Sequence, residues 1–444
     1  MTTTNTNNQL DAILESAKRH GAQQTEVFHV AHEETPVKFE SNRLKELNSR
    51  QTSGVAVRVI ANGRIGFASS TRPGDVEDVV LAALDTAPFG PEAEFDFPGP
   101  SEAPTVAVFD AKTQSVAVDD MIGLGQTLID AVVAAEPEIK CDGSVRKAIG
   151  EQTIANSNGG RFTSRGTMFS AGIYGTLIRG TDMLFVGEGD AAVSPKLDND
   201  MIRNTILEQL ERARRHATCR TADMPVIFTS SGFASAILGP LTMAFNGRLV
   251  HQGQSPLVGE LGQEKYDTRI GLHDDATLDM RPSSRPFDDE GVASRRIPLI
   301  ERGVVTSFMY DLQTAGLAKT QSTASAGRAL TSQPTISPSS LLFAAGETTF
   351  ADMVRGIKEG IVVEELMGAG QGNVMGGDFS GNVLLGYKIE NGEIVGRVKD
   401  TIVAGNVHEA LRSVLAIGSE VRWVGGSVYA PPLLFERLAV SSNS

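Results

Sequence analysis

The chain has few residues of several kinds, and each shortage excludes a class of protein. Its two cysteines, Cys141 and Cys219, form no CxxC pair and are too few for a disulfide framework. No apolar run approaches the roughly 20 residues that a membrane-spanning helix needs. The polar N-terminus lacks the charged and apolar segments of a signal peptide. These shortages predict a cytoplasmic protein with reduced thiols and no membrane segment.

Positive charge is also scarce. The formal net charge is −14, from 40 Lys and Arg against 54 Asp and Glu. Nonspecific binding to nucleic acid needs a positive field, so the charge balance predicts no nucleic-acid partner.

Aromatic residues are few at 6%, whereas glycine is abundant at 46 of 444 residues. This composition favours many short strands, turns and close strand contacts over helical bundles. A chain of this length predicts two domains of roughly 200 residues each. We expect a break at residues 221–225, which separates an N-terminal domain, 1–220, from a C-terminal domain, 221–444.

The N-terminal domain has the pattern of an α+β fold with an internal duplication. Apolar spacing predicts helices at 10–20, from 75 to 87, at 119–135 and at 200–216. Strands are predicted at 26–30, 35–40, 53–60 and 64–68, and again at 139–148, 152–156, 161–177 and 183–190. Both units, 8–87 and 118–216, therefore have the order helix, four strands, helix. Chance recurrence of this order is the alternative explanation.

The C-terminal domain is predicted to be β-rich and barrel-like, with few helices. Strands and hairpins dominate, including the Arg302-Gly303 and Asn391-Gly392 turns. Helices are predicted only at 350–359, where Thr349 and Asp352 have capping-box spacing, and at 407–416.

A glycine-rich run from Gly368 to Gly381 leads into a predicted strand instead of a helix. It matches neither the G-x-G-x-x-G nor the P-loop spacing, which argues against phosphate binding. Glycines allow two backbones to approach closely, so the run is either an edge that binds a peptide or partner, or a turn in the core. The candidate binding residues are Gly370, Gly372, Gly376, Gly377, Asp378 and Ser380.

Familiar catalytic patterns are missing. The seven histidines provide no zincin pair, and the sequence has no G-x-S-x-G elbow. The acidic Asp288-Asp289-Glu290 cluster precedes Gly291, which favours a turn over a catalytic site. A metal site built from some of His251, His273, Asp288 and Glu290 stays open as an alternative.

Several motifs together resemble the TldD/PmbA family, also called peptidase U62 or "modulator of DNA gyrase". In the N-terminal half the matching motif is Ser41–Glu46. The C-terminal motifs are Phe287–Val292, Ile300–Thr306, Ser322–Gly327, Glu365–Gly370, Gly377–Ser380 and Thr401–Asn406. The resemblance implies a two-domain fold and a cytoplasmic metallopeptidase system that acts on extended peptides. Its TldD-like branch carries an H-E-x-x-x-H helix and a later cysteine as zinc ligands.

The chain departs from the TldD-like pattern at the zinc helix. The pattern would place its His, Glu and second His at about Ala236, Ile237 and Leu241, and no cysteine follows Cys219. The resemblance therefore implies a PmbA/TldE-like subunit without catalytic residues or bound metal, with zinc in a TldD-like metallopeptidase partner. We expect a peptide substrate for the complex and a homodimer for the isolated chain. A free-standing metallopeptidase with an atypical site and a regulator that binds gyrase are the alternatives.

Overall fold

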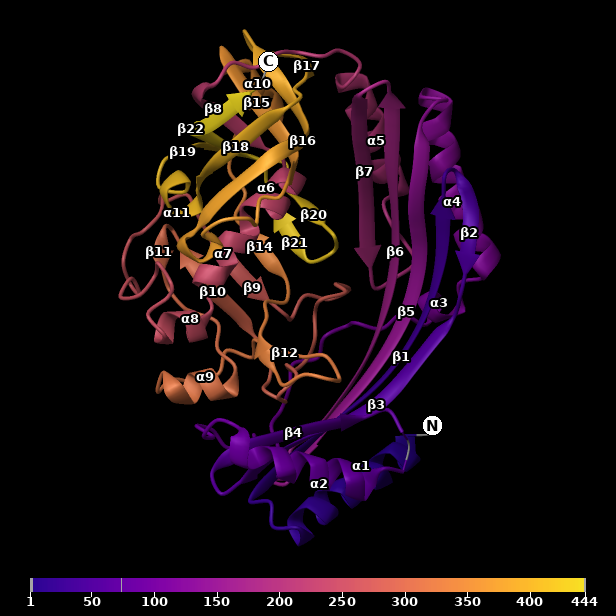
Figure 1. Cartoon of the computed structure of the whole chain (residues 1–444), viewed down its shortest axis with the longest axis vertical. Helices are drawn as coiled ribbons and strands as arrows, with labels where there is room; N and C mark the ends of the chain where they lie inside the picture. The colour runs from indigo at the N-terminus through magenta and orange to yellow at the C-terminus, as the bar shows by residue number, and fades with distance from the viewer. Residues whose placement is uncertain (1–2, 73, 443–444) are drawn as a thin grey trace.

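The computed structural model describes residues 3–72 and 74–442. Its N-terminal half is a long, strongly curved sheet of seven strands in the order β4-β3-β1-β5-β6-β7, with β2 paired to β1 (Figure 1). These strands are β1 (Gln24–Glu40), β2 (Arg43–Leu47), β3 (Arg50–Ala61), β4 (Arg64–Ser70), β5 (Lys140–Asn156), β6 (Arg161–Arg179) and β7 (Asp182–Ala192).

Helices cover the outer face of this sheet at its two ends (Figure 1). At one end lie α1 (Thr3–Arg19) and α2 (Val76–Thr86), which share a core with β1 and β3. At the other end lie α4 (Val118–Ala135) and α5 (Asn199–Arg212), which pack on β5, β6 and β7. The short η1 (Ala87–Phe89) and α3 (Ala111–Ser115) belong to the segment between the two units.

The predicted strand boundaries need correction. The segments 26–30 and 35–40 form the single strand β1, and 139–148 and 152–156 form β5. β1 and β5 pair with each other over fourteen residues, so tertiary pairing carries both strands through the gaps in the apolar pattern. The first unit still has four strands, because it includes β2, which was not predicted, whereas the second unit has three.

The C-terminal half contains a closed barrel of five strands. Its ring is β15 (Glu359–Met367), β8 (Ala222–Phe228), β22 (Leu433–Ser442), β18 (Thr401–Asn406) and β16 (Asp378–Glu390), closed by the pairing of β15 with β16. Strands β17 (Glu393–Arg397) and β19 (Val414–Ile417) extend it.

A second sheet lies beside the barrel. Its order is β11 (Val304–Val305), β10 (Arg296–Glu301), β9 (Leu272–Asp275), β14 (Leu341–Phe343), β21 (Val428–Ala430) and β20 (Arg422–Val424). The short strands β12 (Ala326–Gly327) and β13 (Thr335–Ile336) form a separate pair. The predicted α+β class with a barrel-like C-terminal region is confirmed.

The C-terminal helices differ from the prediction. Four of the helices were not predicted from the sequence. They are α6 (Ser230–Ala236), α7 (Leu238–Ala244), α8 (Gly247–His251) and α9 (Leu312–Leu317). The predicted helix at 350–359 is α10 (Phe350–Arg355) and ends before Gly356. The predicted helix at 407–416 is wrong beyond α11 (Val407–Ala410), because residues 414–417 form β19 and pair with β22.

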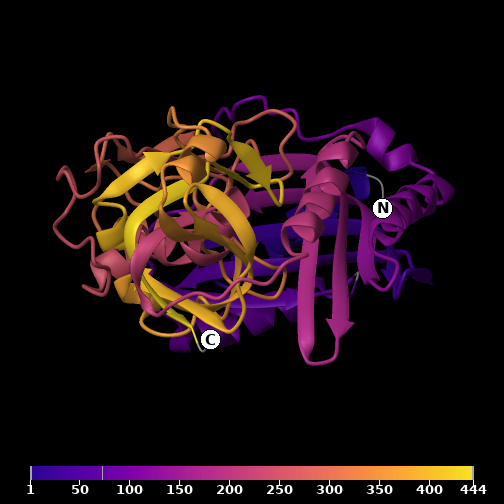
Figure 2. The same ribbon diagram turned by 90° about the horizontal axis from the view of Figure 1, so that it is seen from above.

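The N-terminal sheet curves around the C-terminal half, so that its concave face looks onto the barrel and the second sheet (Figures 1 and 2). No helix within the described ranges is long and apolar enough to cross a membrane.

Candidate functional site

A groove of about 570 Å³ lies between the N-terminal sheet and the C-terminal half. One wall is formed by β6 and β7, and the opposite wall by α6 and β15. Small residues predominate on both walls. They are Ser144, Ser170, Ala171, Gly172, Gly187, Gly189, Ala191, Ser231, Ala234, Ser235 and Gly425. The groove therefore has space for the main chain of another molecule.

Helix α6 is held tightly against β15. Thr229 caps the helix by accepting a hydrogen bond from the Gly232 N–H at 3.2 Å. A Cβ on Gly232 would lie 2.2 Å from the Val363 carbonyl oxygen, so only glycine permits this approach. The contact turns Ser231, Ala234 and Ser235 toward the groove.

The other wall ends at the edge of β7, where side chains bind the outward backbone groups. The Gly187 N–H donates to the Gln209 side-chain oxygen at 2.8 Å, and the Gln209 amide donates to the Gly187 carbonyl at 3.3 Å. The Gly189 N–H donates to Glu188, and the Ala191 N–H to Asp190, at 2.9 and 2.8 Å. This edge is therefore covered by side chains instead of another strand.

The groove is acidic. Among the described residues, its lining includes Glu188, Asp190, Glu364 and Glu365 and no Lys, Arg or His. Glu188 pairs with Arg422 at 2.5 Å and Glu364 with Arg212 at 3.6 Å, from outside the lining. Burial raises the pKa of Glu364, opposed by the nearby Arg212, and burial alone raises the pKa of Glu365. Because four carboxylates line the groove and only two of them pair with an arginine, a cation entering the groove would meet a negative potential.

The predicted glycine-run residues Gly370, Gly372, Gly376 and Gly377 lie on the loop that joins β15 to β16, and Asp378 and Ser380 lie at the start of β16. Gly370, Gly372, Asp378 and Ser380 are exposed, Gly376 is half-buried and Gly377 is buried. The run packs beside α7 through the short helix η2 (Val374–Gly376). Its exposure leaves the predicted peptide or partner contact open, but these residues do not line the groove between the two halves.

Asn406 holds this loop in shape. Its side-chain amide donates to the Gly376 carbonyl at 2.9 Å and to the Asp378 carboxylate at 2.8 Å. Gly377 has φ of 92°, and a Cβ there would lie 2.4 Å from the His408 ring. The glycine at this position is thus required by backbone conformation and by packing.

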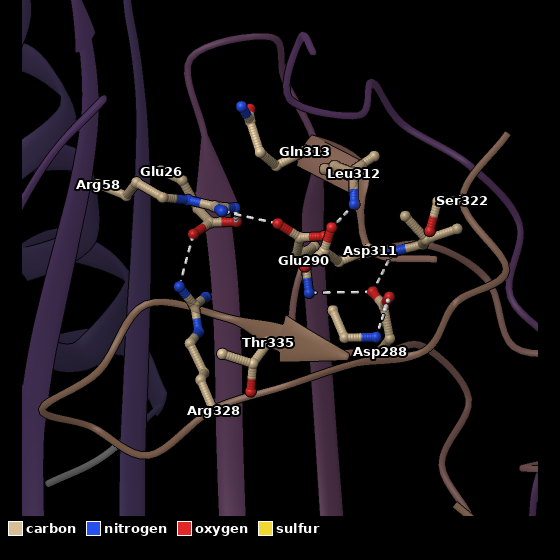
Figure 3. A network of polar contacts seen from close by, with 12 residues as sticks. Glu26, Arg58, Asp288, Glu290, Asp311, Leu312, Gln313, Ser322, Arg328 and Thr335 are labelled. Carbon is tan, nitrogen blue, oxygen red and sulfur yellow. Dashed lines mark hydrogen bonds and ion pairs between the residues drawn. The ribbon is translucent and has the colours of Figure 1, made fainter. Parts of the chain in front are cut away.

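A buried ionic network joins the two halves of the molecule (Figure 3). Arg58 on β3 pairs with Glu26 at 3.1 Å and with Glu290 at 2.6 Å, and Arg328 pairs with Glu26 at 2.7 Å. All four side chains are at most 3% exposed. Arg58 and Glu290 are 232 residues apart in the sequence, so no local pattern could have revealed this pair.

The acidic cluster at 288–290 forms the predicted turn, with Gly291 at φ of 78°. Asp288 accepts backbone N–H bonds from Glu290, Val292 and Ala326, and Glu290 accepts one from Leu312. Burial raises the pKa of Asp288 to about 6 and that of Glu290 to about 7, although nearby arginines oppose both shifts. The carboxylates of Asp288 and Glu290 thus hold neighbouring loops together by accepting their backbone hydrogen bonds.

The alternative metal site does not assemble. His251 is exposed at the end of α8, and His273 on β9 lies 3.7 Å from Glu301. Glu290 belongs to the buried ionic network, and the Asp288 carboxylate accepts backbone N–H bonds instead. Within residues 3–72 and 74–442, no group of three or more His, Cys, Asp or Glu is arranged to hold a metal ion.

The positions that correspond to the zinc helix lie in α6, in α7 and at the junction between them. Ala236, Ile237 and Leu241 are at most 1% exposed and belong to the main apolar core of the C-terminal half. None of these side chains can bind zinc or act as a base, so the residues present do not fit the family's metal.

Comparison with known proteins agrees with this architecture. Residues 221–442 match the model of the PmbA/TldA metallopeptidase C-terminal domain, and residues 25–87 match that of PmbA/TldA metallopeptidase domain 1. Metalloprotease PmbA of Escherichia coli O157:H7 is 26% identical over 400 residues, covering 85% of this chain and 82% of its own length.

Two crystal structures share the fold over almost the whole chain. TldE from Thermococcus kodakarensis has a TM-score of 0.87 and 22% identity, covering 98% of this chain and all of its own. A Thermotoga maritima protein described as a candidate modulator of DNA gyrase gives the same values. The family model alone spans half of the chain, so the protein belongs to the PmbA/TldD metallopeptidase family.

Proposed function

We propose that this chain is a PmbA/TldE-like subunit of a TldD/PmbA-type metallopeptidase system. It pairs with a TldD-like subunit that carries the catalytic zinc, helps to hold the peptide substrate, and cleaves no peptide itself. In isolation it forms a homodimer in place of the mixed complex. The family match and the TldE-like fold support membership of this system.

The observation that carries the proposal is the replacement of the zinc helix by core residues. Ala236, Ile237 and Leu241 fill the interior of the C-terminal half, where polar ligands would have to be buried. Installing a metal site there would require both new side chains and an opening in the core. The alternative cluster of His251, His273, Asp288 and Glu290 offers no substitute, because these side chains do not come together within the described residues.

Zinc content and peptidase activity of the purified chain test this proposal, with and without a TldD-like partner from the same cell. We expect less than about one zinc per ten chains, no cleavage of unfolded peptides by the chain alone, and chelator-sensitive cleavage by the mixture. Stoichiometric zinc together with chelator-sensitive cleavage by the isolated chain would overturn it.

A further inference from the structure

We propose that the edge of β7 within the groove binds an extended, positively charged peptide segment as an added strand. This inference rests on the proposed function, because it names the site and the substrate class by which this subunit holds peptide. It places the contact between the two halves of the molecule, away from the glycine-rich run.

The edge has the hydrogen-bonding groups that an added strand needs. In the described part of the sheet, β7 pairs only with β6. Both backbone groups of Gly187 bond to Gln209, so they point away from β6. Along an antiparallel ladder, residue pairs that are hydrogen-bonded to each other alternate with pairs that are not. The backbone N–H and C=O groups of Gly189 and Ala191, two and four residues after Gly187, therefore also point away from β6.

Side chains now occupy the positions of the missing strand. The Gln209 amide donates one hydrogen bond to Gly187 and accepts one from it. A neighbouring strand would offer the same pair of hydrogen bonds through its backbone. The carboxylates of Glu188 and Asp190 take the next two outward N–H groups. An incoming peptide can replace these contacts with backbone hydrogen bonds of the same kind.

The groove has the shape for such a strand. Gly172, Gly187 and Gly189 leave the sheet surface bare, and Ser231 and Ser235 face them from α6. Tyr174 lies over Gly187, where a Cβ would come within 2.5 Å of its ring, and its side chain is 63% exposed. This ring offers an apolar surface beside the edge for a peptide side chain.

The charge of the groove selects the peptide. Arg422 and Arg212 pair with Glu188 and Glu364, which leaves Asp190 and Glu365 without an ion pair in the described structure. Among the described residues, the Asp190 carboxylate accepts backbone N–H bonds from Ala191 and Asp198, and it also interacts electrostatically with Arg281. A Lys or Arg side chain, or a terminal ammonium, would complement these two charges.

Fluorescence anisotropy of the full chain tests the site with fluorescein-labelled (Ala-Lys)4 as the probe. We expect (Ala-Glu)4 of the same length, and an (Ala-Lys)4 peptide N-methylated at every backbone nitrogen, to bind at least about 10-fold more weakly. The N-methylated peptide keeps its charge but loses main-chain donors. Equal affinity of the unmodified and N-methylated peptides would overturn the added strand.

Substitutions in the groove locate the binding. Ser235→Trp fills the groove from an exposed position, and we expect it to weaken (Ala-Lys)4 binding by about 10-fold or more. Glu365→Gln should weaken it by about 3-fold, whereas the matched control Glu15→Gln on the distant α1 should not change it. Unchanged binding by Ser235→Trp, with an unchanged melting temperature, would overturn the site.

The two proposals can fail separately. Absence of peptide binding by a chain that still supports cleavage by its TldD-like partner would reject the groove and leave the subunit role intact. Stoichiometric zinc and cleavage by the isolated chain would reject the subunit role, whatever the groove binds.

Discussion

At the scale of single residues, buried polar side chains affect the stability of the protein, and His408 is an example. It lies under the glycine-rich loop, and its Nδ1 is 2.8 Å from the Tyr266 hydroxyl. Its Nε2 is buried without a hydrogen-bond partner among the described residues. Burial, helped by the charges of Lys265 and Arg412, lowers the pKa of His408 to about 4. The imidazole is therefore neutral in the folded protein near pH 7.

The low pKa of His408 predicts a loss of stability in acid. Between pH 6.5 and about 4 the unfolded chain binds a proton here that the folded chain does not, so stability falls as the pH falls through this range. The loss reaches about 3 kcal/mol below pH 4, from the size of the shift. Urea unfolding at several pH values should show a shallower acid slope for His408→Gln than for the wild type.

An exposed histidine provides the control for this measurement. His251→Gln, at the surface end of α8, should leave the acid slope unchanged. The same slope in the wild type and in His408→Gln would show that another group causes the acid sensitivity.

At the scale of elements, the groove depends on how closely α6 packs on β15. Gly232 permits this contact, because its Cα faces the Val363 carbonyl. The neighbouring helix α7 contains Gly239, which is exposed, and a Cβ added there would meet no atom within 4 Å among the described residues. Gly232 therefore has no room for a side chain, whereas Gly239 in the adjacent helix does.

This contrast gives a paired prediction. Gly232→Ala should destabilise the protein by about 1–3 kcal/mol, because the new methyl group forces α6 away from β15. Gly239→Ala should stabilise it by roughly 0.5–1 kcal/mol, because alanine favours the helix and meets no atom. Urea midpoints measure both changes. A loss of stability for Gly239→Ala equal to that for Gly232→Ala would contradict the packing argument.

At the scale of the whole molecule, the buried network of Arg58, Glu26, Glu290 and Arg328 ties the N-terminal sheet to loops of the C-terminal half (Figure 3). Further out, Arg422 pairs with Glu188 and Arg397 with Asp182, again across the two halves. The groove is bounded by both halves, so its width depends on these ties.

Removing Arg58 should have a large effect. Arg58→Met leaves Glu26 and Glu290 buried with less positive charge beside them, so we expect a loss of about 3–5 kcal/mol in the free energy of unfolding. Arg50→Met, at an exposed position on the same strand, should change it by less than about 0.5 kcal/mol. Comparable urea midpoints for the two variants would show that the network contributes little.

Local sequence patterns predicted much of the fold. The helices α4 and α5 and the hairpin at Arg302-Gly303 came from apolar period and turn residues, which act within a few positions. The length of β1 and β5 could not be predicted, because each strand is stabilised by a partner more than a hundred positions away. The strand β19 could not be predicted, because its extended form depends on tertiary pairing with β22, as of Val414 with Phe435. The short helices α6 and α7 were missed because their apolar residues face the core of the C-terminal half on several sides. The five-residue helix α8 was missed because it buries only Gly247 and so has no apolar pattern of its own.

The sequence by itself determined the family motifs, the fold class and the absence of zinc ligands at 236, 237 and 241, because these depend only on residue identity and spacing. Only the tertiary structure decided where the features that support the proposed peptide contact lie. The edge of β7, its cover by Gln209 and the acidic residues from β7 and β15 come together through folding of distant segments. Hydrogen-bonding groups on a strand edge, and the space beside them, exist only once the sheet and its neighbours are in place.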